Sequence, residues 1–222
     1  MFKEFWDKRW AESQIGFHEG RPNALLERFG EHLRADFGRR VLVPLCGKAV
    51  DLRWLAERGF DVLGVEFVQR AAEAFFVENF GELEVERGED GGLPCLSAGG
   101  VRIAVGDFFA WDPRRSEPLA VAYDRAALVA VRPEDRERYA AHLVGALPPG
   151  GRILLVTFAY DSSLMNGPPF SVDGDEVQRL FATTCRIERL ADEDILDKEP
   201  RFRQRGLTWL REQAWLLEVL PR

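Results

Sequence analysis

Three residues of this sequence could together hold a nucleotide-like ligand, because each follows a short apolar run. Gly47 and Glu66 follow the first two runs, nineteen residues apart, and Asp107 follows a later run. A glycine permits a tight turn that brings the backbone close to a ligand. A carboxylate accepts hydrogen bonds from ribose hydroxyl or adenine amino groups. The spacing therefore predicts a site for an adenosine-like ligand.

The elements that must position Gly47 and Glu66 form a βαβ unit. Val41–Leu45 and Val62–Val65 are apolar runs with the length of buried strands, and the apolar positions between them have helical spacing. Gly59 stands where a glycine ends such a helix. Ligands of parallel sheets bind beyond the carboxyl ends of the strands. We therefore expect the site at that end.

Strand and helix patterns alternate along the rest of the chain. Further strands are predicted at Val101–Val105, Leu119–Tyr123, Arg152–Tyr160, Arg186–Leu190 and Trp209–Val219, and helices at Pro22–Leu33, Gln69–Asn79, Pro133–Leu147 and Asp175–Phe181. The glycine-rich segment Gly81–Gly100 is expected to be a surface excursion with one short strand at Leu83–Glu86. This alternation predicts an α/β fold with a doubly wound, mainly parallel sheet.

The N-terminal segment carries more aromatic residues than a disordered leader would. They are Phe2, Phe5, Trp6, Trp10 and Phe17, with His18 beside them. Two compatible interpretations are an amphipathic helix docked on the core and a lid that closes over a flat apolar ligand. We expect one domain over residues 1–222, with a helical lid region at 1–35 and a cofactor-binding α/β core at 36–222.

Composition narrows the possible partners. The net charge of −7 argues against nucleic acid, whose partners need a basic face. The three cysteines are far apart and predict neither a disulfide framework nor a zinc site, so we expect no metal. The charged N-terminus and the absence of a long apolar run predict a soluble cytoplasmic protein. Nothing in the sequence demands more than a monomer.

The loop chemistry selects among the nucleotide-like cofactors. Cys46-Gly47-Lys48 lacks the glycines and the Lys-Ser/Thr pair of a phosphate-binding loop, and a single glycine does not make a dinucleotide fingerprint. S-adenosylmethionine has no phosphate but still needs a tight turn and an acid for its ribose. Asp107 could accept from the adenine amino group, with Phe108 against the ring. The set favours a methyltransferase.

These residues belong to longer motifs, and over nearly its whole length the chain resembles the thiopurine S-methyltransferase family. PLCGK at Pro44–Lys48 and DRAALVA at Asp124–Ala130 are specific to that family. GDFF at Gly106–Phe109 and GPPF at Gly167–Phe170 also occur in the related plant thiol and halide methyltransferases. The remaining matches are Trp6, Trp10 and Phe17-His18, the rest of VLVPLCGKAVDLRWLAERG, GVE at Gly64–Glu66, and RPEDRERYA at Arg132–Ala140.

The resemblance implies a class I S-adenosylmethionine-dependent methyltransferase fold, with the cofactor bound by Trp10, Leu45, Glu66 and Arg125. It implies methyl transfer to the sulfur of aromatic or heterocyclic thiols, with selenium or tellurium species as further acceptors in bacterial members. It also places Phe17, His18 and an arginine near the C-terminus at the acceptor. That arginine is expected at Arg201, with Arg203 and Arg205 as alternatives.

Arg125 is the candidate catalytic residue. A thiolate is already a good nucleophile, so no dedicated base is needed, and a nearby guanidinium favours the ionised thiol. The alternative for Arg125 is an ion pair with Asp124 or Glu66. Cys46 is interpreted as a small packed residue, and His18 as either a proton relay or a structural histidine.

Two other functions remain open. The related thiol and halide methyltransferases share part of the motif set, and a non-catalytic protein could retain the cofactor fold. A nucleic-acid methyltransferase is disfavoured, because DRAAL stands at Asp124–Leu128, after the fourth predicted strand, where an Asn/Asp-Pro-Pro-Tyr/Phe motif would be expected.

Overall fold

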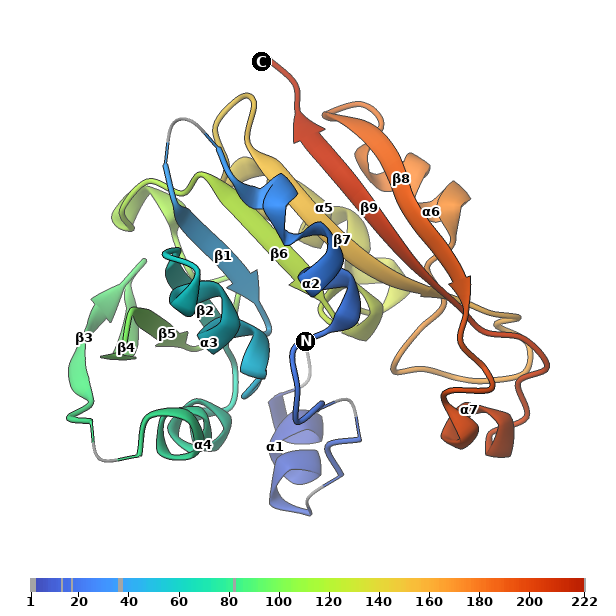
Figure 1. Cartoon of the computed structure of the whole chain (residues 1–222), viewed down its shortest axis with the longest axis horizontal. Helices are drawn as coiled ribbons and strands as arrows, with labels where there is room; N and C mark the ends of the chain where they lie inside the picture. The colour runs from blue at the N-terminus through green and yellow to red at the C-terminus, as the bar shows by residue number, and fades with distance from the viewer. Residues whose placement is uncertain (1–2, 13, 17, 36–37, 82, 222) are drawn as a thin grey trace. The chain divides into compact units, whose positions relative to one another are not determined.

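The structure is a computed structural model that describes residues 3–12, 14–16, 18–35, 38–81 and 83–221. The chain forms two compact units, Met1–Tyr123 and Asp124–Arg222. Figure 1 labels their helices and strands. The expected division into a lid region at 1–35 and a core at 36–222 stays a prediction.

The first unit contains a sheet with the strand order β3-β4-β5-β2-β1-β6. Its strands are β1 (Arg40–Pro44), β2 (Asp61–Glu66), β3 (Glu86–Asp90), β4 (Leu93–Ala98), β5 (Val101–Val105) and β6 (Val121–Arg125), which ends two residues beyond the unit. Strands β5, β2, β1 and β6 run parallel, and β3 and β4 pair antiparallel. The α-helices of this unit are α1 (Lys3–Ala11), α2 (Ala24–Phe29), α3 (Val50–Glu57) and α4 (Gln69–Phe80).

The predicted βαβ unit is confirmed. Strand β1 pairs in parallel with β2, with Val41 opposite Val62, and every residue of β1 is buried. This is expected for a parallel strand covered on both faces. Helix α3 connects the two strands and buries Leu52 and Leu55 completely, which stabilises the fold by about 1.5–3 kcal/mol for each side chain. Gly59, just beyond the helix, has a φ of 83°.

The segment after α4 differs from the prediction. The prediction of a surface excursion with a short strand at Leu83–Glu86 was wrong, because β3 and β4 form a hairpin in which Glu86 pairs with Ser97 and Asp90 with Leu93. Gly91 and Gly92 connect them with φ values of 58° and 84°, as a two-residue hairpin turn requires. Most of β3 is exposed and charged, so it carries no apolar alternation that could have indicated a strand.

The second unit contains three antiparallel strands in the order β7-β9-β8. They are β7 (Arg152–Ala159), β8 (Cys185–Asp194) and β9 (Arg211–Val219), and the α-helices are α5 (Arg136–Gly145), α6 (Gly174–Phe181) and α7 (Pro200–Gln204). The predicted strands at 152–160, 186–190 and 209–219 are confirmed, and so are the helices now called α5 and α6. Helix α7 was not predicted. It docks through Phe202, which packs in a cluster with Tyr160, Met165, Ile195, Leu196, Leu207 and Leu210.

No helix in the described part of the chain is long and apolar enough to span a membrane.

Candidate active site

Glu66, the last residue of β2, connects three strand ends of the first unit. One carboxylate oxygen accepts the backbone N–H of Gly47 at 2.7 Å, and the other accepts that of Val68 at 2.8 Å. The backbone carbonyl of Glu66 accepts the N–H of Gly106 at 2.8 Å, at the end of β5. The residue is 6% exposed. The turn glycine, the acid and the GDFF motif that the sequence indicated therefore meet at one residue.

The environment of Glu66 makes its carboxyl group unusual. Burial raises its pKa from 4.5 to about 7, although the backbone N–H groups of Val68, Gly47 and Phe67 act in the opposite direction. Asp7 in α1 raises the pKa further through its charge. A carboxylate has about four lone-pair positions, so after these N–H contacts both oxygens can still accept hydroxyl hydrogen bonds. The group is therefore suited to bind a ribose in its ionised form.

The turn after β1 has a constrained backbone. Leu45 has a φ of 46° and Gly47 a φ of 55°. The left-handed conformation is unfavourable for leucine, and such strain gathers at ligand sites. The backbone N–H of Cys46 donates to the carbonyl of Val65 at 3.2 Å, which ties this turn to β2. Cys46 is buried, and burial raises its thiol pKa well above the usual value. The interpretation of Cys46 as a packed residue is confirmed.

Helix α1 brings Trp10 onto this turn. Trp10 is 8% exposed and packs with Val68 and Ala71, and Trp6, Ile15 and Phe67 pack against this cluster. A Cβ atom added to Gly47 would lie 3.2 Å from the Cζ2 atom of Trp10. The aromatic ring therefore fits closely against a residue that has no side chain. The predicted N-terminal helix is confirmed, and its movement as a lid stays a prediction.

Asp107 and Phe108 follow β5 but have different environments. The carboxylate of Asp107 accepts the backbone N–H of Phe109 at 3.0 Å, which fixes the turn. Phe108 is 1% exposed and stacks on Trp111, with ring centroids 6.3 Å apart and an interplanar angle of 8°. The contact of Phe108 with adenine stays a prediction. Phe109 is only half-buried and offers more ring surface to a ligand.

Arg125 ends β6 in a second strained segment. It is half-buried, and the next residue, Ala126, has a φ of 63°. The carboxylate of Asp124 accepts the hydroxyl of Tyr139 at 2.7 Å and the backbone N–H of Leu128 at 3.1 Å. Burial raises the pKa of Asp124 to about 6. The buried carboxylate thus ties the residue before Arg125 to the backbone that follows it, and the catalytic role of Arg125 stays a prediction.

The three arginines near the C-terminus have different partners. Arg201 is half-buried, forms an ion pair with Glu199 at 2.8 Å and lies 5.0 Å from the ring centroid of Phe202. The exposed Arg203 is paired with Asp197, and the exposed Arg205 donates to the carbonyl of Asn166 at 3.1 Å. The contact of Arg201 with an acceptor stays a prediction.

Two predicted acceptor residues, Phe17 and His18, belong to the region 1–35 that is expected to form the lid. Phe17 lies outside the described residues. His18 is half-buried, and its backbone N–H donates to the carbonyl of Ile15 at 2.8 Å. Both interpretations of His18, a proton relay and a structural histidine, stay predictions.

Sequence reasoning missed the groups that fix the predicted residues in place. The backbone N–H of Val68 holds Glu66, and no side-chain pattern could have indicated that contact. Tyr139 holds Asp124 from fifteen residues away. The signal in the sequence was that Tyr139 and Asp124 stand in two of the quoted motifs, RPEDRERYA and DRAALVA, and that a tyrosine hydroxyl usually finds a polar partner when it is buried.

Comparison with known proteins finds a family and individual relatives that are similar to this chain. The model of the family described as thiopurine S-methyltransferase matches residues 1–219. Proteins named thiopurine S-methyltransferase from Pseudomonas aeruginosa (strain UCBPP-PA14) and Pseudomonas fluorescens (strain Pf0-1) are 44% and 46% identical to the chain. The first alignment covers 98% of this chain and 99% of the relative, and the second covers 97% and 98%.

Solved structures with lower sequence identity share the fold. A structure titled for the conversion of a disulfide bond into a thioacetal group during echinomycin biosynthesis has a TM-score of 0.65 and 16% identity, covering 99% of this chain and 93% of its own. A TehB-like SAM-dependent methyltransferase from Corynebacterium glutamicum has a TM-score of 0.56 and 15% identity, with coverage of 98% and 97%. The predicted class I methyltransferase fold is confirmed.

Proposed function

The chain belongs to the thiopurine S-methyltransferase family, and from that premise we propose that it transfers the methyl group of S-adenosylmethionine to the sulfur of an aromatic or heterocyclic thiol. The observation that carries the proposal is the carboxylate of Glu66. It is buried at a strand end, fixed by the backbone N–H groups of Gly47 and Val68 and still able to accept from two hydroxyl groups. A ribose has two adjacent hydroxyl groups that match these acceptors.

The residues of the first unit fit the cofactor in chemical type. Glu66 would hold the ribose, and Asp107 has the carboxylate that an adenine amino group needs. The strained turn at Leu45 and Gly47 presents backbone to the ligand, and Trp10 covers that turn. When bound, S-adenosylmethionine supplies an electrophilic methyl group on a positively charged sulfur.

The protein's own contribution to the reaction is orientation. Fixing two reactants in line can remove about 7–11 kcal/mol from a barrier, and a thiolate needs no further activation. The aromatic cluster around Trp10 keeps water away from the turn. For Arg125 we propose stabilisation of the thiolate, since a guanidinium lowers the pKa of a neighbouring acid.

Calorimetric titration with S-adenosylmethionine tests the cofactor site. Glu66→Gln should weaken binding about 10- to 100-fold, because a hydrogen bond to a charged group is worth about 1.5–3 kcal/mol. Glu86→Gln is the matched control, since Glu86 is exposed on β3. Unchanged affinity in Glu66→Gln would mean that the cofactor site is elsewhere.

A turnover assay tests the reaction. The wild type should methylate a thiophenol-type acceptor, with the thioether detected by mass spectrometry. Cofactor binding without turnover on any thiol or chalcogen acceptor would favour a non-catalytic protein. Faster methylation of iodide than of thiols would move the chain to the thiol and halide branch. A monomer, a cytoplasmic location and the absence of a nucleic-acid partner stay predictions.

A further inference from the structure

The segment 124–131, which carries Arg125, accepts hydrogen bonds from three residues outside it. The hydroxyl of Tyr139 donates to Asp124 at 2.7 Å. The backbone N–H of Phe170, in the GPPF motif, donates to the carbonyl of Val129 at 2.6 Å. The guanidinium of Arg136 donates through Nε to the carbonyl of Val131 at 3.4 Å. These contacts connect DRAALVA, RPEDRERYA and GPPF, which are distant in sequence, into one hydrogen-bonded group.

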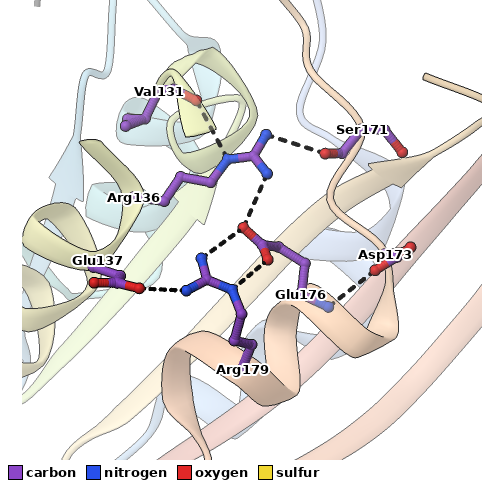
Figure 2. Close-up of polar contacts among 7 residues, drawn as sticks. All are labelled: Val131, Arg136, Glu137, Ser171, Asp173, Glu176 and Arg179. Carbon is purple, nitrogen blue, oxygen red and sulfur yellow. Dashed lines mark hydrogen bonds and ion pairs between the residues drawn. The ribbon is translucent and has the colours of Figure 1, made fainter. Parts of the chain in front are cut away.

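Arg136 connects this segment to the loop that follows β7. Besides Val131, it donates to the carbonyl of Ser171 at 3.1 Å and to the carboxylate of Glu176 at 3.1 Å. Figure 2 shows the guanidinium of Arg136 reaching all three acceptors. Its side chain is 5% exposed. A buried guanidinium with three acceptors in different directions fixes their relative positions.

The loop is tied down on its other side by Tyr160. The hydroxyl of Ser171 donates to the carbonyl of Tyr160 at 2.9 Å, and its oxygen accepts the N–H of the same residue at 3.1 Å. The hydroxyl of Tyr160 donates to the carbonyl of Pro169 at 2.7 Å. Phe170 and Ser171 therefore lie between Tyr160 and the segment that carries Arg125.

A row of alternating charges supports Arg136. The carboxylate of Glu176 also accepts from Arg179, which in turn donates to Glu137 (Figure 2). Exposure of the side chains falls along this row. It is 77% at Glu137, 47% at Arg179, 20% at Glu176 and 5% at Arg136. The carboxylate of Glu176 compensates the buried positive charge of Arg136, while Arg179 is exposed to solvent. Arg136 and Arg179 thus share one carboxylate but differ in their other contacts.

We propose that Arg136 is a positioning residue for methyl transfer, which sets the geometry of the Arg125 segment against the GPPF loop. This inference rests on the proposed function, because it assigns Arg125 to the acceptor. Lysine at position 136 would keep the positive charge but could not reach three acceptors with a planar fork. The substitution should therefore impair acceptor turnover more than cofactor binding.

The test compares Arg136→Lys with Arg179→Gln as a matched control. The control removes a guanidinium from the same Glu176 but touches neither Val131 nor Ser171 in the structure. The measurements are kcat and KM for an aryl thiol, the Kd of S-adenosylmethionine, and the thermal midpoint, with all assays well below that midpoint. We expect Arg136→Lys to lower kcat/KM at least about tenfold with a Kd changed less than about twofold. Arg179→Gln should change each less than about twofold.

Other outcomes are distinguishable. If the wild type methylates no thiol, the proposed function itself fails. If the wild type is active and Arg136→Lys retains its kcat/KM, or loses it only in proportion to cofactor affinity, positioning by Arg136 is wrong. Should Arg136→Lys fail to fold, Arg136→Gln replaces it, because its amide keeps a planar donor but cannot reach Val131, Ser171 and Glu176 together. A kcat/KM equal to that of the wild type in this variant would then overturn the inference.

Discussion

The raised pKa of Glu66 predicts that cofactor affinity rises with pH. Burial holds the pKa of this carboxyl at about 7 in the free protein, whereas a ribose hydroxyl needs the ionised form as its acceptor. Below neutral pH, binding must first remove a proton from Glu66. The test therefore raises the pH from 6 to 8 at constant ionic strength and measures the Kd of S-adenosylmethionine.

The magnitude follows from the pKa. With a pKa near 7, roughly one molecule in eleven is ionised at pH 6 and ten in eleven at pH 8, so the Kd should fall about tenfold, or about 1.4 kcal/mol. Stability changes in the opposite direction. Because the pKa in the folded protein lies above the ordinary value of 4.5, this carboxyl is most favourable to folding below pH 4.5. Its contribution is lost as pH rises towards 7, by about 3 kcal/mol.

Calorimetry in buffers of different ionisation enthalpy measures both the affinity and the protons released. At pH 6, wild type should release close to one proton more than Glu66→Gln, and this comparison cancels the titration of the cofactor's own amino group. In denaturant unfolding, raising the pH from 5 to 8 should lower the free energy of unfolding of the wild type more than that of Glu66→Gln. If wild type and Glu66→Gln show the same pH dependence in both measurements, the carboxyl is ionised throughout and the reasoning is wrong.

Two further predictions concern Trp10 and Arg125. Trp10→Ala should lower the free energy of unfolding by about 3 kcal/mol, as truncation of a buried aromatic does, and should raise the Kd of S-adenosylmethionine. Phe5→Ala, at a ring that is 41% exposed, is its control in denaturant titrations and calorimetry, and equal effects of the two would contradict a special contact with the turn. Arg125→Ala should lower kcat/KM more than Arg125→Lys, and more for a high-pKa aryl thiol than for one already ionised, since the guanidinium favours the thiolate. Equal losses on both thiols would assign Arg125 to positioning or to cofactor binding.

The parts of the fold that local patterns determine could be predicted from the sequence. Val41–Leu45 and Val62–Val65 are apolar over the length of a strand, and both became buried parallel strands. The glycine and the acid at their ends met as expected, because carboxyl ends of parallel strands lie on one edge of a sheet. Hydrophobic periodicity carries this information within a few residues of chain.

Features that depend on distant partners could not be predicted. The hairpin of β3 and β4 pairs charged residues on an exposed strand, so hydrophobic alternation was absent. Arg136 looked like one of many helix arginines, and only folding brings Val131, Ser171 and Glu176 to it. The burial of Phe108 on Trp111 likewise depends on packing between side chains rather than on the GDFF motif.

The charged hairpin has a consequence for the behaviour of the protein at high concentration. Strand β3 is the outermost strand at one end of the order β3-β4-β5-β2-β1-β6, and its backbone could serve as a template for a strand of another molecule. Four of its five residues carry charge, with Arg87 between Glu86 and Glu89. Adding a foreign strand there would bring charged side chains out of water, and natural sheets discourage aggregation at exposed edges in this way. We therefore expect the charge on β3, which also kept the strand from showing hydrophobic alternation, to disfavour amyloid-like assembly at this edge.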